Sequence, residues 1–274
     1  MNRTERYKLL LVCVAICAAS SLALLSGCKG NASAAATYEK PVTAPPHIQA
    51  YQTLSDAHLA DPLTSPVWTG AHWFTFTSPI GTDRTTAAAS GTLLFDANTL
   101  YVGFISQKPG HAFTQDMVSV YLDTSALGNG AEMLQVAVNS EGRAACTWIR
   151  DAQPPTRAKD DGTPDTVHPS SKIPVDKVAN LFTRIGEGTL NGEPVWTAVV
   201  AIPLNSLPGP LRATPTPGAQ WKVNLLRTTM VGEPNANLEQ LQANLSPVYV
   251  GQQAVAPYRM ATLELVNTQV SAAQ

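Results

Sequence analysis

The chain has 274 residues, of which 44% are hydrophobic and only 14% are charged, and its formal net charge is −2. A nucleic-acid-binding protein needs a basic face, so this balance excludes that class of partner. The 21 prolines and 18 glycines indicate many turns rather than long surface helices.

The first 27 residues have the layout of an export signal. Arg3, Arg6 and Lys8 precede an apolar run from Leu9 to Leu25, and small residues follow. This order is typical of a secretory signal peptide. Leu25-Ser26-Gly27-Cys28 resembles the lipobox of bacterial lipoproteins, which implies cleavage before Cys28 and acyl chains, palmitate among them, on that residue. The alternative is a membrane anchor, because about seventeen apolar residues is the lower limit for crossing a bilayer.

Residues 28–50 are predicted to form a flexible tether. Runs such as Pro41-Val42-Thr43-Ala44-Pro45-Pro46 cannot bury enough apolar surface to offset the entropy of ordering. In lipoproteins of this type an aspartate after the cysteine is the usual signal for retention in the inner membrane, and Lys29 stands there instead. We therefore expect a chain anchored at Cys28 in the cell envelope, at the outer membrane, with a folded domain over 51–268 and a tail over 269–274.

The folded domain is predicted to be all-β. Turn signals at Asp96-Ala97-Asn98, Ser140-Glu141-Gly142 and Leu190-Asn191-Gly192 separate runs with strand patterns, which favours hairpins. Short strands divided by turns predict an antiparallel β-sandwich with long loops. The predicted strands are Ser90–Phe95, Thr99–Gln107, Asp116–Asp123, Glu132–Asn139, Arg143–Arg150, Asn180–Thr189, Glu193–Ile202, Gln220–Thr228 and Tyr258–Val266.

Three further segments complete the prediction. Only Pro203–Leu207 has a helical pattern, about one turn long. Gln153–Lys172 and Gly232–Pro257 are polar or proline-rich, and loops of this length are either functional or disordered.

The signatures of common catalytic sites are absent from the sequence. It has no Gly-x-Ser-x-Gly, His-Glu-x-x-His, phosphate-loop or Gly-x-Gly-x-x-Gly motif, and its five histidines lack metal-ligand spacing. Asp116 and Asp123 are seven residues apart on one strand, so they point to opposite faces, and we expect them to cap the strand ends rather than to act as a glycosidase pair. Cys146 has no cysteine left to pair with in the mature chain, and we expect a small buried side chain.

Several motifs together resemble a known family. Asp96-Ala97-Asn98-Thr99-Leu100-Tyr101-Val102-Gly103-Phe104, Gln115–Asp123, Trp196–Leu204, Trp221–Arg227 and Pro257–Leu263 follow one another in the order seen in family 9 carbohydrate-binding modules. The resemblance covers about Thr53 to Val266. It implies a jelly-roll-like sandwich that binds a saccharide end, or a polysaccharide end, without cleaving it.

The resemblance also assigns candidate ligand-binding residues. In the family two aromatic rings grip the sugar, since a ring packs on the apolar face of a pyranose and polar groups serve its hydroxyls. Phe113 stands at the first ring position, Leu245 replaces the second ring, and Tyr249 could substitute for it. Gln135 and Asn139 are expected to be hydrogen-bond partners of the sugar on one face of their strand. Ala137 and Ser119 stand where the family has Arg and Glu.

Other readings stay open at this stage. The missing ring and the missing Arg favour a protein-interaction or structural module that has lost sugar binding. The third interpretation is an accessory component of an O-glycosyl hydrolase system in polysaccharide catabolism. No cofactor is expected. Some family members bind structural calcium, for which Asp56, Asp61 and Asp160 could serve as oxygen ligands. Of the tryptophans, Trp196 and Trp221 are expected in the core, Trp68 against the sandwich, and Trp148 in either packing or ligand contact.

Overall fold

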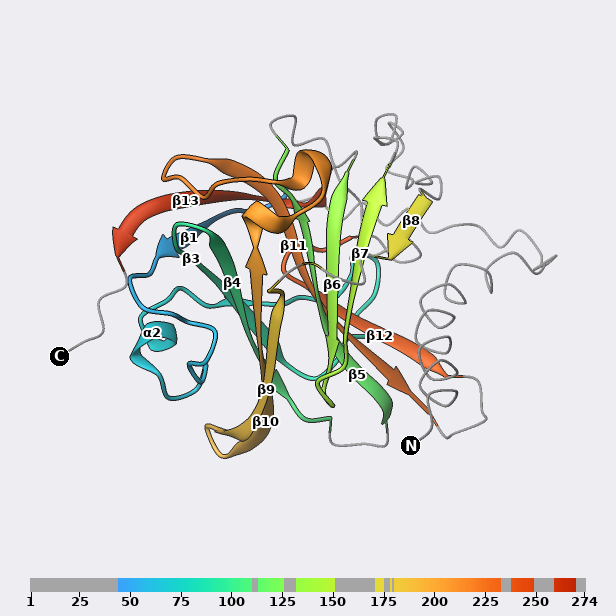
Figure 1. Cartoon of the computed structure of the whole chain (residues 1–274). Coiled ribbons are helices and arrows are strands. Elements are labelled where there is room, and N and C mark those ends of the chain that lie inside the picture. The colour runs from blue at the N-terminus through green and yellow to red at the C-terminus, as the bar shows by residue number, and fades with distance from the viewer. Residues whose placement is uncertain are drawn as a thin grey trace, which may run out of the picture. The chain divides into compact units, whose positions relative to one another are not determined.

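The computed structural model describes residues 44–109, 113–125, 132–150, 171–174, 178, 180–232, 238–248 and 259–269. Strands dominate the described chain (Figure 1). In chain order they are β1 (His47–Gln52), β2 (Phe74–Thr75), β3 (Ala89–Phe95), β4 (Thr99–Gln107), β5 (Phe113–Asp123), β6 (Met133–Asn139), β7 (Ala144–Arg150), β8 (Ser171–Pro174), β9 (Phe182–Leu190), β10 (Glu193–Pro203), β11 (Gln220–Val231), β12 (Glu239–Asn244) and β13 (Ala261–Gln269).

Helices are short in the described chain. They are α2 (Pro66–Thr69) and two 3₁₀ turns, η1 (Leu204–Ser206) and η2 (Gly209–Leu211). Within the described residues, none is long and apolar enough to cross a bilayer. The one-turn helix predicted over Pro203–Leu207 is η1, whereas α2 was not predicted.

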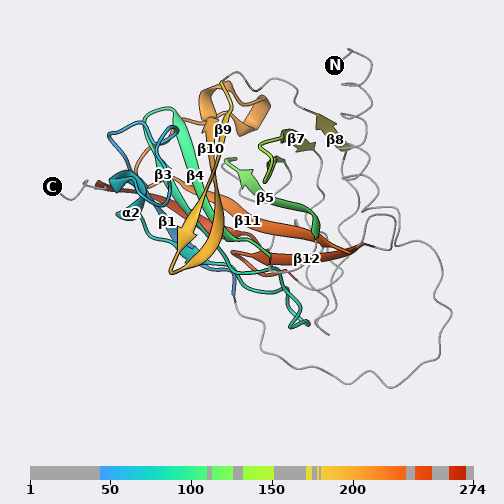
Figure 2. The same ribbon diagram turned by 90° about the horizontal axis from the view of Figure 1, so that it is seen from below.

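The strands form one hydrogen-bonded path that folds over to make two layers. Its order is β8-β7-β6-β5-β11-β13-β1-β3-β4-β10-β9, with β12 beside β11 and β2 beside β3. Val120 of β5 and Val102 of β4 lie five steps apart on this path, yet both belong to the main apolar core. The path therefore folds over into two facing layers, which make a β-sandwich, as predicted (Figure 2).

Turn chemistry explains why the predicted hairpins form. Asn191 and Gly192 have φ values of 53° and 86°, which is the left-handed pair that a tight hairpin between β9 and β10 requires. Asp96 Oδ1 accepts hydrogen bonds from the backbone N–H groups of Asn98 and Thr99, both at 2.8 Å, so this carboxylate closes the turn between β3 and β4.

Strand β4 is buried on both faces. Leu100, Val102 and Phe104 face the main core, and Tyr101 faces a second cluster that contains Trp68 of α2. A Cβ atom on Gly103 would lie 2.9 Å from the Trp68 ring, so the close approach of the indole requires glycine there. The segment around α2 thus covers the outer face of β3 and β4 (Figure 1).

The structure differs from the sequence-based prediction at three places. The tether predicted over 28–50 ends earlier, because Ile48 and Ala50 are buried in β1. β1 is parallel to both of its neighbours, β13 and β3, so the sandwich is not wholly antiparallel. The stretch predicted as irregular over Gly232–Pro257 contains β12, which lies beside β11 as its antiparallel partner (Figure 2).

Candidate functional site

The candidate ligand residues Gln135 and Asn139 lie on the outer face of the sheet formed by β11, β5, β6 and β7. Val118, Val120 and Leu122 of β5 face the core, so the alternate residues of that strand, and those paired with them, face outward. Gln135 is opposite Tyr121 and Asn139 is opposite Met117. Both candidates therefore share one face, as their spacing predicted.

The two amides have different partners. Gln135 Nε2 donates to the Tyr121 hydroxyl at 2.9 Å, which places an amide and a phenol side by side on this face. Asn139 Oδ1 accepts from the backbone N–H groups of Arg143 at 2.8 Å and Glu141 at 3.2 Å. Asn139 therefore closes the turn between β6 and β7, and its oxygen is already engaged.

Strand register separates the other candidates from this pair. Phe113 opens β5 and is opposite Val231, eight positions along the strand from Tyr121, which corresponds to about 26 Å. One sugar ring cannot contact both Phe113 and Gln135 over that length. Tyr249, Cys28 and Asp160 lie outside the described residues.

Leu245, at the second ring position of the resemblance, belongs to the main core and is 7% exposed. Its backbone N–H donates to the carbonyl of Leu225 at 2.8 Å. Leu245 therefore packs inside the sandwich and offers no platform to a sugar. Ser119 and Ala137 are opposite each other on the outer face, where the family resemblance leads one to expect two charged side chains.

Asp116 and Arg227 form a buried ion pair that sequence reasoning missed. Arg227 Nε and Nη2 donate to the two Asp116 oxygens at 2.9 and 2.6 Å. Thr229 and Trp196 donate to the same carboxylate at 3.0 and 2.7 Å. All four acceptor positions of the carboxylate are then filled, so this group cannot serve as a catalytic acid or base.

The guanidinium of Arg227 is saturated as well. Nη1 donates to the carbonyls of Ala87 and Ala88 at 2.8 and 3.1 Å, and Nη2 donates to the carbonyl of Gln107 at 2.7 Å. Ala87 and Ala88 directly precede β3 and Gln107 is the last residue of β4, and both strands lie in the opposite layer. The pair is thus a polar cross-link between the two layers. Asp116 points inward and Asp123 outward, which confirms that the two side chains lie on opposite faces of β5.

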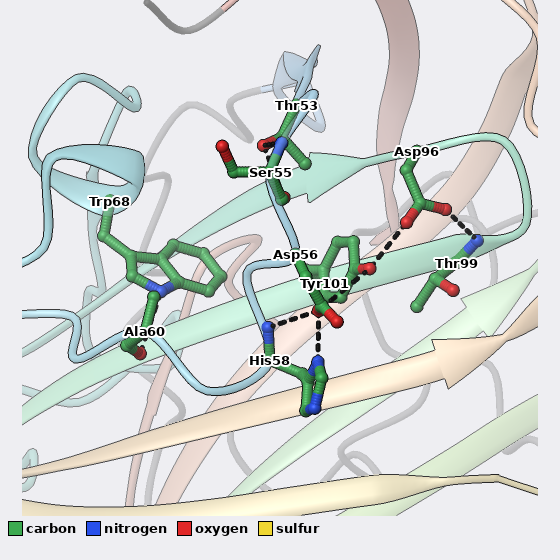
Figure 3. Close-up of polar contacts among 9 residues, drawn as sticks. All are labelled: Thr53, Ser55, Asp56, His58, Ala60, Trp68, Asp96, Thr99 and Tyr101. Atoms are coloured by element: carbon green, nitrogen blue, oxygen red, sulfur yellow. Dashed lines mark hydrogen bonds and ion pairs between the residues drawn. The ribbon is translucent and has the colours of Figure 1, made fainter. Parts of the chain in front are cut away.

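A second polar cluster lies where the segment before α2 meets β4 (Figure 3). The Tyr101 hydroxyl donates to Asp96 Oδ2 at 2.6 Å and lies 3.5 Å from Asp56 Oδ1. Burial, assisted by these two carboxylates, holds the pKa of Tyr101 well above its ordinary value. The hydroxyl therefore stays protonated and pins the segment to the sheet.

Asp56 is shared between this cluster and His58. The His58 ring and backbone N–H both bond to the Asp56 carboxylate. Burial alone would raise the pKa of Asp56, but these hydrogen bonds outweigh burial and lower that pKa. The His58 ring also packs edge-on against Phe182 of β9, with centroids 4.7 Å apart. The cluster thus ties three parts of one layer together.

Asp56 and Asp61, two of the proposed calcium ligands, serve local turns. Asp61 Oδ1 accepts from the backbone N–H of Leu63 at 2.8 Å, and Asp56 is bound to His58 and Tyr101. Across the described part of the chain, no group of three or more His, Cys, Asp or Glu side chains is placed to hold a metal ion.

The tryptophans follow the prediction, whereas Cys146, predicted to be buried, is only partly buried. Trp196 and Trp221 lie in the core and Trp68 is fully buried. Trp148 is half-buried, donates to Glu132 Oε2 at 3.0 Å and packs against Gly209, so packing is its observed role. Burial raises the pKa of the Cys146 thiol to about 12, which keeps it protonated and unreactive.

Comparison with known proteins identifies the architecture. No family model and no curated protein matches the chain. An inferred carbohydrate-binding protein from Bacteroides uniformis has a similar structure, with a TM-score of 0.55 and 10% identity over 81% of this chain and all of that one. A family 9 carbohydrate-binding module from Caldicellulosiruptor kristjanssonii is also similar.

Two structures of the Caldicellulosiruptor module match. The complex with cellotriose has a TM-score of 0.47 and the complex with glucose 0.48; both are 15% identical over 80% of this chain, and over 94% and 96% of theirs. At such low identities a likeness concerns the fold. The chain is therefore an all-β sandwich that shares its architecture with the protein from Bacteroides uniformis.

Proposed function

We propose that this chain binds a saccharide without cleaving it. The observation that carries the proposal is the pairing of the Gln135 amide with the Tyr121 hydroxyl on the outer face of β5 and β6. An amide and a phenol beside apolar side chains suit a ligand that has hydroxyl groups and a C–H face. The fold shared with an inferred carbohydrate-binding protein supports the proposal.

Binding without hydrolysis agrees with how the carboxylates are used. Hydrolysis of a glycosidic bond needs two free carboxyl groups that flank the bond. Asp116 has every acceptor position occupied, and Asp56 and Asp96 serve turns and Tyr101. These described carboxylates are structural, which favours a binding module that accompanies other enzymes of polysaccharide catabolism.

The proposed setting is the bacterial cell envelope. A diacylglyceryl group and a further acyl chain on Cys28 would hold the protein on a membrane stably, whereas one chain alone is marginal. The lipobox-like Leu25-Ser26-Gly27-Cys28 supports this proposal, and Lys29 favours the outer membrane.

One observation favours a second function, a protein-interaction module. Leu245 is buried at the position where the resemblance requires a ring, so a two-ring clamp on a sugar cannot form there. A sandwich that kept its fold and changed its ligand would have this feature.

Titration calorimetry of the full chain tests the proposal. Cellotriose, xylobiose and glucose should give measurable but weak binding, and Gln135→Ala should lower the affinity at least tenfold. Gln49→Ala makes the same change at an exposed position on β1 and should leave affinity unchanged. If none of these sugars, nor any member of a broad glycan array, binds the unaltered chain, the interaction module replaces the saccharide-binding reading.

A further inference from the structure

Strand β9 ends the hydrogen-bonded path and is paired on one side only. It pairs with β10 in a continuous register from Phe182–Ala201 to Leu190–Glu193, and no other strand of the described chain pairs with it. No residue of β9 is buried, whereas β10 is buried from Val195 onward. The second edge of β9 is therefore open within the part of the chain that the structure describes.

The tight turn at Asn191-Gly192 determines which backbone groups face this edge. In a two-residue hairpin the closing pair, Leu190–Glu193, exchanges hydrogen bonds, and such pairs alternate with pairs that do not. The carbonyl of Pro194 accepts from the N–H of Lys108 at 2.8 Å, so Pro194 points to β4 and its opposite residue, Thr189, points away from β10. By this alternation the residues whose N–H and C=O groups face outward are Thr183, Ile185, Glu187 and Thr189, which we call the open edge.

The open edge lacks the features by which proteins usually prevent strands from pairing. Those features are short length, proline, lysine and β-bulges. β9 has nine residues, no proline, no lysine and no shift in its register with β10. The other end of the path provides the contrast, because β8 has four residues and ends in Pro174. The open edge therefore offers a regular row of donors and acceptors to another strand.

A second copy of β9 fits this edge in an antiparallel pairing centred on Gly186. Gly186 is the middle residue of β9, so only this register pairs all nine residues. Thr183 of one copy is then opposite Thr189 of the other, and Ile185 is opposite Glu187. All four belong to the open edge and two-fold symmetry repeats both pairs, so the strands exchange about eight hydrogen bonds at two per pair.

The side chains also favour this register. Arg184 is opposite Gly188 of the second copy, so the positive charge of β9 meets no like charge. Phe182 is opposite Leu190, which is 43% exposed in the single chain, and the pairing covers part of that apolar surface. Registers centred on Arg184 or Glu187 would instead place identical charges face to face, which is destabilising.

We propose that the chain forms a two-fold dimer in which the open edge of β9 pairs with the same edge of a second copy. This inference goes beyond the proposed saccharide binding and does not depend on it. The pairing joins the layer that contains β4, β10 and β9 to its counterpart in the second copy. Each dimer then carries two copies of any ligand-binding face.

Proline at position 187 tests the pairing. The N–H of Glu187 faces the open edge, so Glu187→Pro keeps the hydrogen bonds to β10, removes an outward donor and places its ring against the second copy. In sedimentation equilibrium of the full chain in density-matched detergent, the dissociation constant of the dimer should rise at least tenfold. Glu187→Gln is the matched control, because it also removes the ion pair with Lys108 but keeps the N–H, and it should dimerise like the unaltered chain.

A second variant tests the side-chain contact without changing the backbone. Leu190→Asp replaces the apolar partner of Phe182 with a carboxylate, so it should weaken the dimer at least fivefold. Leu238→Asp is its matched control. Leu238 is 42% exposed and directly precedes β12, which pairs with β11 and not with β9, so this variant should leave dimer affinity unchanged.

Amide hydrogen exchange, resolved to single residues, locates the interface. The N–H groups of Arg184, Gly186 and Gly188 point to β10 and should be protected at every protein concentration. The N–H groups of the open edge should exchange rapidly in the diluted monomer and become protected at concentrations at which the dimer forms.

The outcomes separate a β9 dimer from its alternatives. A chain that stays monomeric up to its solubility limit would overturn the proposal. So would a dimer whose open-edge amides still exchange rapidly, because its interface would lie elsewhere. Protection that appears only after a different protein is added would assign the edge to a foreign strand and exclude the second copy. None of these results changes saccharide binding as measured by calorimetry.

Discussion

Arg227 and Asp116 are 111 residues apart in the chain, yet their side chains form two parallel hydrogen bonds at 2.9 and 2.6 Å, with 0% and 1% of their side-chain surfaces exposed. A buried pair of this kind costs much to desolvate and is stable only when every remaining donor and acceptor is satisfied. Both groups meet that condition here, so the pair holds the layers in one alignment.

Breaking this pair should destabilise the fold strongly. Asp116→Asn leaves the Arg227 charge buried without its counterion, so we expect the free energy of unfolding to fall by about 3–5 kcal/mol. Urea denaturation followed by tryptophan fluorescence measures it. Glu141→Gln removes the exposed partner of Arg143 and should cost less than about 1 kcal/mol. Equal effects of the two substitutions would refute the cross-link.

Tyr101 should make the stability of the fold depend on alkaline pH. Its pKa in the folded state is raised above the ordinary value of 10.0, so between these two values only the unfolded state loses the proton. The free energy of unfolding should therefore be unaffected by this group below pH 10 and fall as the pH rises above it. Urea denaturation at successive pH values, compared with Tyr101→Phe, gives the contribution.

An optical titration checks the same group directly. Tyr101 should remain a phenol in the folded chain when exposed tyrosines have become tyrosinate, so the near-ultraviolet signal should contain a component that ionises late. In Tyr101→Phe that late component should vanish. A late component of unchanged size in the variant would assign it to another tyrosine.

Phe113 tests whether the ring position of the resemblance has kept its role. Phe113→Ala should leave cellotriose affinity unchanged, because strand register puts Phe113 about 26 Å from the position of Gln135. Loss of a stacking ring would instead cost about 1–3 kcal/mol, by analogy with stacking on bases. A fall of that size in calorimetry would place the sugar at the start of β5.

Cys28 is expected to carry lipid, and its replacement should release the protein. Cys28→Ser should stay uncleaved or lose its membrane attachment, because the acyl chains provide the binding energy. Mass spectrometry of the native protein should show a lipidated Cys28 as the first residue. A native protein that begins at an intact Met1 would exclude processing.

The strands that turns and alternation mark could be predicted from sequence, one of them to the residue and the others within three residues at either end. Thr99–Gln107 matches β4, because the Asp96 turn and a long run of β-forming residues mark both ends. β12 was missed since Glu239–Asn244 is a polar strand at the edge of a ribbon, where apolar alternation is weak. β1 was missed because its neighbours in sequence are prolines and alanines, while its stabilising contacts come from β13.

The candidate site was only partly accessible to sequence reasoning. The spacing of Gln135 and Asn139 gave their common face. It could not reveal that Asn139 closes the turn before β7 and that its side-chain oxygen is thereby engaged. The Asp116–Arg227 pair joins residues more than 100 positions apart in the sequence. A residue pattern within one strand cannot predict such a contact.

The position of β1 determines when the sandwich can close. Among the described residues β1 is the first strand, and its hydrogen-bonding partner from His47 to Gln52 is β13, the last described strand. A chain that is synthesised from its N-terminus must therefore hold β1 unpaired on that side until the final strand appears. Contacts between residues so far apart in sequence form late in folding. A copy of the protein that is truncated before β13 therefore leaves one edge of β1 without its partner strand and cannot complete the core.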